Sequence, residues 1–269
     1  MTKLKKITII AVILIVVGAI GCLLTFHKFN DTERVSEQKH IQNQTYTSIE
    51  LRTGNASVEV VPTQAKVATI TLTGKEAKSE GHELKVDVNG QTLSIELKNK
   101  QPIVNLDFGS IFTSLSLKVE IPEKEYKSMV LNNDNGHIDL KDIHVQKVKA
   151  TTDNGYISLK NVASKDVYVG SDNGKIIMEN VTGDLKGKTS NGKISLVTDT
   201  LDRQIELECD NGRINVQTAQ EPTNVRFDVH VDNGRINILD KYDDDAVIGK
   251  GENLIKLSTD NGSISIEGK

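Results

Sequence analysis

The feature that most constrains the fold is a short motif that recurs seven times in the second half of the chain. D-N-G-H-I-D-L begins at Asp134 and D-N-G-Y-I-S-L at Asp153. Closely similar heptapeptides begin at Asp172, Ser190, Asp210, Asp232 and Asp260. Aligned on the asparagine of each Asn-Gly pair, the copies are 19, 19, 18, 20, 22 and 28 residues apart. This nearly constant period predicts a repeat architecture built from one supersecondary unit.

Each repeat alternates like a strand on both sides of its Asn-Gly pair. The third residue after the asparagine is isoleucine in every copy, and the fifth is always apolar. The sixth residue before the asparagine is also apolar, the fourth is apolar or glycine, and the positions between are largely polar. A period of two predicts half-buried strands on either side of a corner, where asparagine and glycine both tolerate a positive φ.

Two all-β architectures satisfy these columns. In a β-solenoid of about seven 19-residue rungs, equivalent residues stack about 4.8 Å apart. In a meander, each Asn-Gly pair forms a two-residue hairpin, and the same alternation results. The identical residues within each column favour the solenoid, because stacking places asparagine on asparagine and such ladders are favourable in stacked sheets. We therefore expect an all-β, β-helix-like solenoid.

The region before the regular repeats is also rich in strand patterns, but it is less periodic. T-G-N-A-S-V-E-V at 53–60 resembles a degenerate rung, and a hairpin is predicted around Asn89 and Gly90. We expect one ectodomain over residues 46–269, in which 46–125 form an irregular N-terminal part and cap, and 126–269 the regular repeats. The C-terminal end shows no obvious cap, although the insertion 241–253 is placed to cover that edge.

The N-terminal segment is apolar and uncharged from Ile7 to Leu24, which is eighteen residues. This length meets the lower limit for a transmembrane helix, and the three lysines before it place the N-terminus in the cytoplasm. We expect residues 1–29 to be a cytoplasmic stub and single-pass membrane anchor, 30–45 a polar juxtamembrane spacer, and the C-terminal domain extracellular. A cleaved signal peptide and a lipoprotein signal ending at Cys22 are alternatives, and both also export the body.

The charge of the chain is unevenly distributed. The whole chain has 33 basic and 37 acidic residues, and the first thirty residues hold four basic and no acidic ones. The remainder therefore carries 29 − 37 = −8. A mildly acidic body argues against general nucleic-acid binding, which needs a basic footprint.

These features together resemble a known family. V-E-I-P at 119–122, followed by serial D-N-G-x-I-x-L units behind one N-terminal apolar segment, is similar to the bacterial "putative adhesin" β-strand-repeat domain, which includes LiaG-like envelope proteins. The resemblance covers roughly residues 46–267. It implies an exported, membrane-anchored protein, in some members linked to cell-envelope stress responses. It supplies no motif for catalytic residues.

Two columns beside the Asn-Gly pairs carry charge. The residue before the asparagine is acidic in six copies: Asp134, Asp153, Asp172, Asp210, Asp232 and Asp260. One carboxylate per rung supplies few of the six to eight oxygens that Ca²⁺ takes, so we interpret this column as turn caps and predict neither a metal site nor a cofactor.

The residue after the glycine is basic in four consecutive copies: Lys175, Lys193, Arg213 and Arg235. In a solenoid these cations would form a ladder. Two interpretations remain open for this ladder: it either balances the acidic column on a solvated face, or it binds a partner with repeated phosphates.

The remaining reactive side chains show no catalytic pattern. Cys209 aligns with small and β-branched residues, which indicates a core position, and the six histidines lack metal-ligand spacing. We therefore expect a noncatalytic, membrane-anchored binding or scaffold protein of the cell envelope, with a role in envelope stress or adhesion. Its expected partner is an anionic wall polymer such as teichoic acid, or a membrane protein of the envelope. The alternatives are a β-helix enzyme acting on polysaccharides and a structural protein that self-associates.

Overall fold

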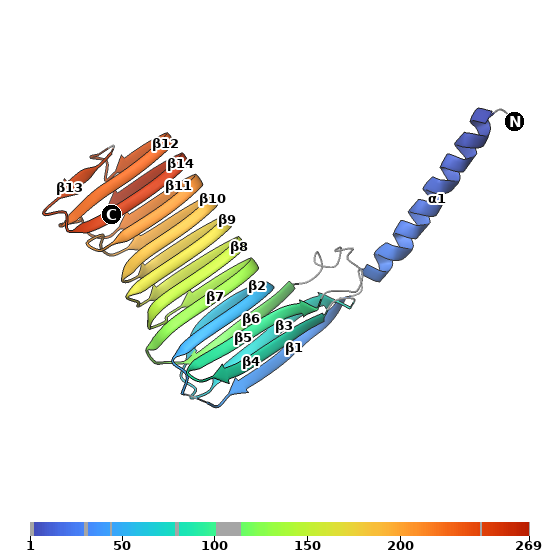
Figure 1. Ribbon diagram of the computed structural model, residues 1–269, viewed down its shortest axis with the longest axis horizontal. Coiled ribbons are helices and arrows are strands. Elements are labelled where there is room, and N and C mark those ends of the chain that lie inside the picture. The colour runs from blue at the N-terminus through green and yellow to red at the C-terminus, as the bar shows by residue number, and fades with distance from the viewer. Residues whose placement is uncertain are drawn as a thin grey trace.

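The structure is a computed structural model that describes residues 3–29, 32–43, 45–78, 81–100, 114–242 and 244–268. One helix precedes a long body of stacked strands (Figure 1). The helix is α1, Lys3–Phe29. The strands are β1 (Thr32–Ile41), β2 (Ser48–Thr63), β3 (Ala68–Ala77), β4 (Gly81–Asn89), β5 (Thr92–Lys100), β6 (Ser114–Pro122), β7 (Tyr126–Lys141), β8 (Val145–Val162), β9 (Asp166–Val181), β10 (Asp184–Thr198), β11 (Ile205–Thr218), β12 (Val225–Ile238), β13 (Ala246–Ile248) and β14 (Asn253–Gly268).

Helix α1 corrects one expectation from the sequence. Within the part of the chain that the structure describes, no helix has the length and apolar character needed to cross a membrane, so the predicted transmembrane helix is wrong. The side chain of Cys22 lies outside the described residues.

Strands β7 to β11 stack in parallel and in register, one repeat to a rung (Figure 1). Asn154 of β8 lies opposite Asn135 of β7 and Asn173 of β9, and Ile157 lies opposite Ile138 and Ile176. A meander of hairpins would pair these strands antiparallel. The parallel register therefore confirms the β-solenoid.

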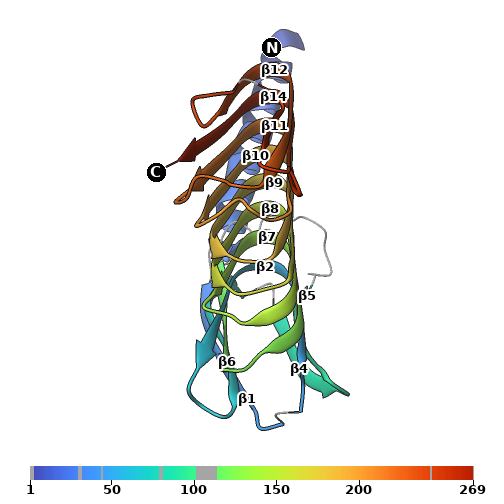
Figure 2. The ribbon, with the colours of Figure 1, turned by 90° about the vertical axis from the view of Figure 1, so that its left-hand side faces the viewer.

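Each long strand turns a corner at its Asn-Gly pair, and its two halves enclose the core (Figure 2). Gly187 lies in the first half of β10, whereas Met178 and Ile194 lie in the second halves of β9 and β10. A Cβ added at Gly187 would lie 3.7 Å from the terminal methyl of Met178 and 3.9 Å from that of Ile194, so the two halves face one another. The isoleucines of the column after the corner are buried, except Ile236 of β12, which is partly buried and packs against the same core. The apolar alternation seen in the sequence therefore fills one continuous core between two outer faces.

Stacking explains the conserved dipeptide within the repeats. The positive φ falls on the glycine, such as 155° at Gly155. Among the described residues, no asparagine of these pairs has a positive φ. A Cβ on Gly155 would overlap the carbonyl oxygen of Gly136 in the rung before it. Glycine is thus required by the close approach of neighbouring rungs, while asparagine serves a side-chain ladder.

The last rungs do not follow chain order. Strand β14 inserts between β11 and β12 and pairs in parallel with both. The side-chain oxygen of Gln204 accepts a hydrogen bond of 3.0 Å from the backbone N–H of Leu254, and the amide of Asn253 donates one of 2.8 Å to the carbonyl of Asn224. These contacts, made where the strands begin, hold β14 between its two neighbours.

The two ends of the solenoid are closed differently. Strand β2 forms the first rung, with Asn55 opposite Asn135, which confirms the degenerate rung predicted at 53–60. Its first half pairs in parallel with β5, which in turn pairs with β4. Its second half pairs in parallel with β6, and β3 and then β1 follow outward from β6 (Figure 2). At the other end, β13 pairs antiparallel with Val225–Phe227 of β12, so the insertion 241–253 does cover that edge.

Strand β1 lies within the polar segment 30–45 that was expected to be a spacer. It pairs antiparallel with β3 along its whole length, yet of its side chains only Val35 is buried. Because β1 is held by backbone hydrogen bonds and buries almost no apolar surface, its sequence lacks the alternation that predicts a strand.

Candidate binding surfaces

The four predicted cations occupy one column on the outer face, immediately past the corner. Lys193 lies opposite Lys175 on one side and Arg213 on the other. Ser263 of β14 then separates Arg213 from Arg235. We call Lys175, Lys193, Arg213 and Arg235 the basic ladder. The structure thus brings three of these cations together directly, and it sets the fourth two rungs away.

The basic ladder has no acid among its nearest neighbours. On a sheet face these neighbours are the residues opposite on adjacent strands and those two places along the same strand. For the ladder they are Tyr156, Asn173, Ile177, Asn191, Ser195, Asn211, Asn215, Ser263, Asn233 and Asn237, besides the cations themselves. Within the described residues, no ion pair and no side-chain hydrogen bond engages the four cations.

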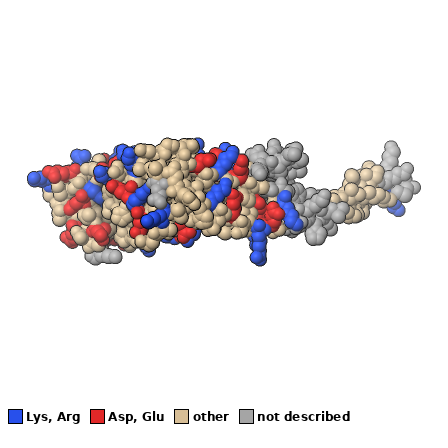
Figure 3. All heavy atoms as spheres, turned by 90° about the horizontal axis from the view of Figure 1, so that it is seen from below, with Lys and Arg blue, Asp and Glu red and all other residues tan. Residues whose placement is uncertain are grey.

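Other lysines of the body show the opposite pattern. Lys186 donates a hydrogen bond of 2.9 Å to Glu206 on the adjacent strand, and this bond raises the pKa of the lysine. Lys188 and Glu208 make the equivalent pair at 2.7 Å. In the view of Figure 3, basic and acidic side chains are interspersed over the body. The lack of acidic neighbours is therefore not a general property of the cations of the body.

Adjacent ladder cations repel one another. Two unit charges about 4.8 Å apart, the separation of neighbouring strands, repel by about 0.9 kcal/mol in water. Three of the four residues are exposed and Lys193 is half-buried, so their charged ends face solvent. An anion bound along the column would relieve this repulsion, and guanidinium groups would contact its oxygens in a forked geometry.

The acidic column lies on the other side of the corner and is mostly exposed. The structure shows no ion pair between it and the basic ladder among the residues described. The one ion pair found for this column joins Asp232 to His230 at 2.7 Å. No group of three or more His, Cys, Asp or Glu side chains in the described ranges is arranged to hold a metal ion. The interpretation that the two columns balance one another therefore gains no support from direct contacts.

Two aromatic rings extend the ladder column toward the N-terminal end. His137 and Tyr156 occupy the positions equivalent to Lys175 in the two preceding rungs. Their ring centroids are 5.6 Å apart in an edge-to-face arrangement. The same column thus changes from rings to cations along the solenoid axis.

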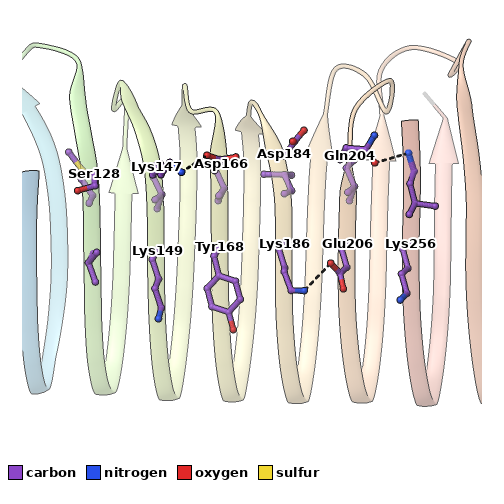
Figure 4. A pocket seen from close by; sticks show the side chains of 17 residues that line it. Ser128, Lys147, Lys149, Asp166, Tyr168, Asp184, Lys186, Gln204, Glu206 and Lys256 are labelled. Carbon is purple, nitrogen blue, oxygen red and sulfur yellow. Dashed lines mark hydrogen bonds and ion pairs between the residues drawn. The ribbon is translucent and has the colours of Figure 1, made fainter. Parts of the chain in front are cut away.

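A groove of about 580 Å³ crosses the outer face of the opposite half of the rungs (Figure 4). It runs over β7, β8, β9, β10, β11 and β14, between two rows of outward side chains. The row nearer the strand starts contains Ser128, Lys147, Asp166, Asp184, Gln204 and Leu254, and the second row contains Val130, Lys149, Tyr168, Lys186, Glu206 and Lys256. The sequence does not indicate this groove, because the residues of its two rows vary from rung to rung.

Salt bridges join some residues of the groove across strands. Lys147 lies 3.3 Å from Asp166, and Lys186 lies 2.9 Å from Glu206. Lys149 instead lies over the ring of Tyr168, with its ammonium nitrogen 5.8 Å from the centroid. The groove therefore combines one aromatic ring with a rim of mixed charge.

A second hollow of about 480 Å³ lies near the N-terminal cap. Lys124 on its wall donates a hydrogen bond of 2.7 Å to the carbonyl of Tyr46 and lies 4.4 Å from the centre of that ring. Burial lowers the pKa of Lys124 and raises the pKa values of Tyr46 and Tyr126. These contacts anchor the loop before β7 to the start of β2.

Cys209 lies where the sequence placed it, fully buried in the core. Its thiol is 3.7 Å from the carbonyl oxygen of Gly192, and burial raises the pKa of the thiol. Because the thiolate is the reactive form, this environment makes Cys209 an inert core residue.

The fold and its surfaces define a class of protein, a β-solenoid whose outer faces carry side-chain ladders. The chain belongs to the Toastrack DUF4097 family, which matches residues 46–169 and 126–267. The two matched segments overlap, as expected for a chain of similar repeats. This membership confirms the resemblance found in the sequence.

Several solved structures are similar to the chain. A "putative cell adhesion protein" from Clostridium sporogenes is 16% identical and has a TM-score of 0.40, with 88% of this chain and 100% of that chain covered. A "putative adhesin" from Bacteroides fragilis is 10% identical with a TM-score of 0.41, covering 88% and 97%. A "putative lipid binding protein" from Parabacteroides distasonis is 16% identical with a TM-score of 0.35, covering 87% and 94%. At TM-scores this low the likeness carries no argument about function. No curated protein matches the chain.

Proposed function

We propose that the protein is a noncatalytic binding protein whose basic ladder holds a linear polyanion along the solenoid axis. The observation that carries this proposal is the lack of any acidic neighbour beside Lys175, Lys193, Arg213 and Arg235. Cations spaced by the strand repeat suit an anion that also repeats, because each rung can contact a successive charge.

The proposed partner is an anionic polymer of the cell envelope, with teichoic acid as the representative phosphate polymer. This partner requires the body to lie outside the cytoplasm, and that location is part of the proposal. A role in envelope stress or adhesion stays a prediction.

The test measures binding of the full chain to purified cell walls, before and after removal of teichoic acid, across a salt series. We expect binding to walls that contain the polymer, and weaker binding as salt rises, because neutralised phosphates release counterions. Replacing Lys175, Lys193, Arg213 and Arg235 with serine should abolish the binding and flatten its salt dependence.

A matched control variant removes four cations that already have acidic partners. Lys85, Lys98, Lys118 and Lys160 lie 3.4, 2.8, 2.9 and 3.3 Å from Glu83, Glu96, Glu120 and Glu179. Their replacement with serine changes the net charge equally and should leave most of the binding intact. Equal loss in the two variants would show nonspecific attraction, and failure of the native chain to bind would reject the polyanion in favour of a protein partner.

A further inference from the structure

The groove on the opposite outer face contains a second candidate site, centred on Tyr168. This tyrosine lies on β9 two residues before Gly170, and both point outward. A Cβ placed on Gly170 would lie 3.3 Å from both the Cε1 and the hydroxyl oxygen of Tyr168. The ring therefore rests on the backbone at Gly170, where any larger residue would lift it. Figure 4 shows the ring face-on within the row of side chains.

We propose that the exposed face of Tyr168 is a stacking platform for one ring of an acidic saccharide. An aromatic face carries a partial negative charge and attracts the weakly positive C–H groups on one side of a sugar ring. Tyr168 is half-buried, so one face lies against the strand while the other faces the groove.

The rim of the groove supplies the polar contacts that a sugar needs. Asp166, Asp184 and Glu206 provide acceptors for hydroxyl groups, and Lys147 and Lys186 provide donors. Lys149 has no ion pair with any residue that the structure describes, and its ammonium nitrogen lies over the ring of Tyr168, 5.8 Å from the centroid. This cation is placed to contact a carboxylate or phosphate on the stacked sugar.

The same composition argues against two other occupants. A protein partner would bury the centre of the groove, yet such centres are depleted of Lys, Glu and Asp. Seven charged residues line this groove: Lys147, Lys149, Asp166, Asp184, Lys186, Glu206 and Lys256. A free acyl chain is also disfavoured, because it would remove the charged side chains along the groove from water without pairing them. A sugar, which has one apolar face and many hydroxyl groups, matches both the ring and the rim.

The test exploits the absence of tryptophan from the chain. Tyr168→Trp places the only indole at the platform, so its fluorescence reports on that site alone. The probes are hexagalacturonate, neutral cellohexaose and inorganic polyphosphate. We expect hexagalacturonate to change the emission saturably, cellohexaose to bind at least fivefold more weakly, and polyphosphate, which has no ring, to leave the emission unchanged. Tyr242→Trp, at an exposed tyrosine near β12, should not respond to any probe.

Two further variants separate this site from structural effects and from the basic ladder. Lys149→Ser should weaken hexagalacturonate at least fivefold and leave cellohexaose unchanged, whereas a merely structural lysine would affect both probes equally. Replacing the basic ladder with serine in the Tyr168→Trp chain should preserve the response, because the ladder lies on the other face. Lack of response to either sugar, or an equal response to polyphosphate, would overturn the proposal.

Discussion

The side-chain amide of Asn154 donates a hydrogen bond of 2.9 Å to the side-chain oxygen of Asn135, its equivalent in the preceding rung. The same bond recurs at 2.8–3.2 Å through eight asparagines, in the spatial order Asn55, Asn135, Asn154, Asn173, Asn191, Asn211, Asn261 and Asn233. Each interior asparagine both donates and accepts. The loss of one member therefore breaks two bonds.

We predict that Asn211→Ala lowers the free energy of unfolding by about 1–3 kcal/mol, because Asn211 makes two ladder bonds and each contributes about 0.5–1.5 kcal/mol. The measurement is urea unfolding of the full chain. Asn215→Ala is the control, since Asn215 is on the same strand, faces outward and makes no side-chain hydrogen bond to the described residues. Equal stability of the two variants would show that the ladder contributes nothing.

Two Asn-Gly pairs in this protein require glycine for different reasons. Gly155→Ala should destabilise the fold by about 2–4 kcal/mol, since its Cβ would overlap the carbonyl oxygen of Gly136 and force the rungs apart. Gly90 in the β4–β5 hairpin has a φ of 59° and no atom within 4 Å of an added Cβ. Gly90→Ala should therefore cost only about 1–2 kcal/mol, the strain of the left-handed conformation. Thermal unfolding of the two variants measures their loss of stability. A larger loss for Gly90→Ala than for Gly155→Ala would contradict the stacking argument.

The Asp202 carboxylate provides a pH-dependent contribution to stability. Although burial raises its pKa, hydrogen bonds lower it overall: 2.6 Å from the hydroxyl of Thr223, and 3.0 Å from each of the backbone N–H groups of Thr223 and Asn224. Since the folded pKa lies below the unfolded value of about 3.9, the stabilisation is complete above that value. It is lost as the pH falls through the folded pKa.

Asp202→Asn should therefore lower the free energy of unfolding by about 1 kcal/mol at pH 7, where the charge-assisted bonds are intact. The difference from the native chain should shrink as the pH is lowered from 4 toward 2. Urea unfolding at a series of pH values measures this difference. A difference that stays constant with pH would mean that the charge of Asp202 does not matter.

The free edge of β12 is covered by several separate contacts. β13 pairs with Val225–Phe227, Asp245 accepts a hydrogen bond of 3.0 Å from the backbone N–H of Val229, and the N–H of Ile238 donates one of 2.9 Å to the carbonyl of Tyr242. Exposed strand edges recruit other chains, and such covers prevent this.

Asp245→Ala combined with Val247→Pro should uncover part of this edge, because one change removes the acceptor and the other disrupts β13. We expect the variant to form dimers or larger species at concentrations where the native chain keeps its own association state. Sedimentation velocity is the measurement. Asp244→Ala, a change at an exposed neighbour, is the control, and unchanged sedimentation of the double variant would show that β13 does not protect the edge.

The sequence was sufficient to predict the strands of each rung, because their pattern is local and repeated. The isoleucine and asparagine columns could be aligned without a structure, and the identity of the residues within each column favoured stacked rungs over hairpins. The parallel register then confirmed the stacking. The sequence also located the basic ladder. The sequence did not predict strand β1, because its pairing with β3 depends on backbone hydrogen bonds rather than on buried side chains.

The sequence by itself determined that the D-N-G repeats form strands on both sides of a corner with an aliphatic inner face, a consequence of their fixed period and alternation. It favoured parallel stacking over hairpins, and the register of the strands decided between them. Tertiary structure alone decided the order of the last rungs. Contacts of Gln204 and Asn224 with the start of β14 place Ser263 between Arg213 and Arg235. Tertiary structure alone also formed the groove around Tyr168. Its two rows bring together residues from six rungs, and no single residue type recurs throughout either row. Local periodicity specifies each rung, whereas contacts between distant segments decide which rungs become neighbours.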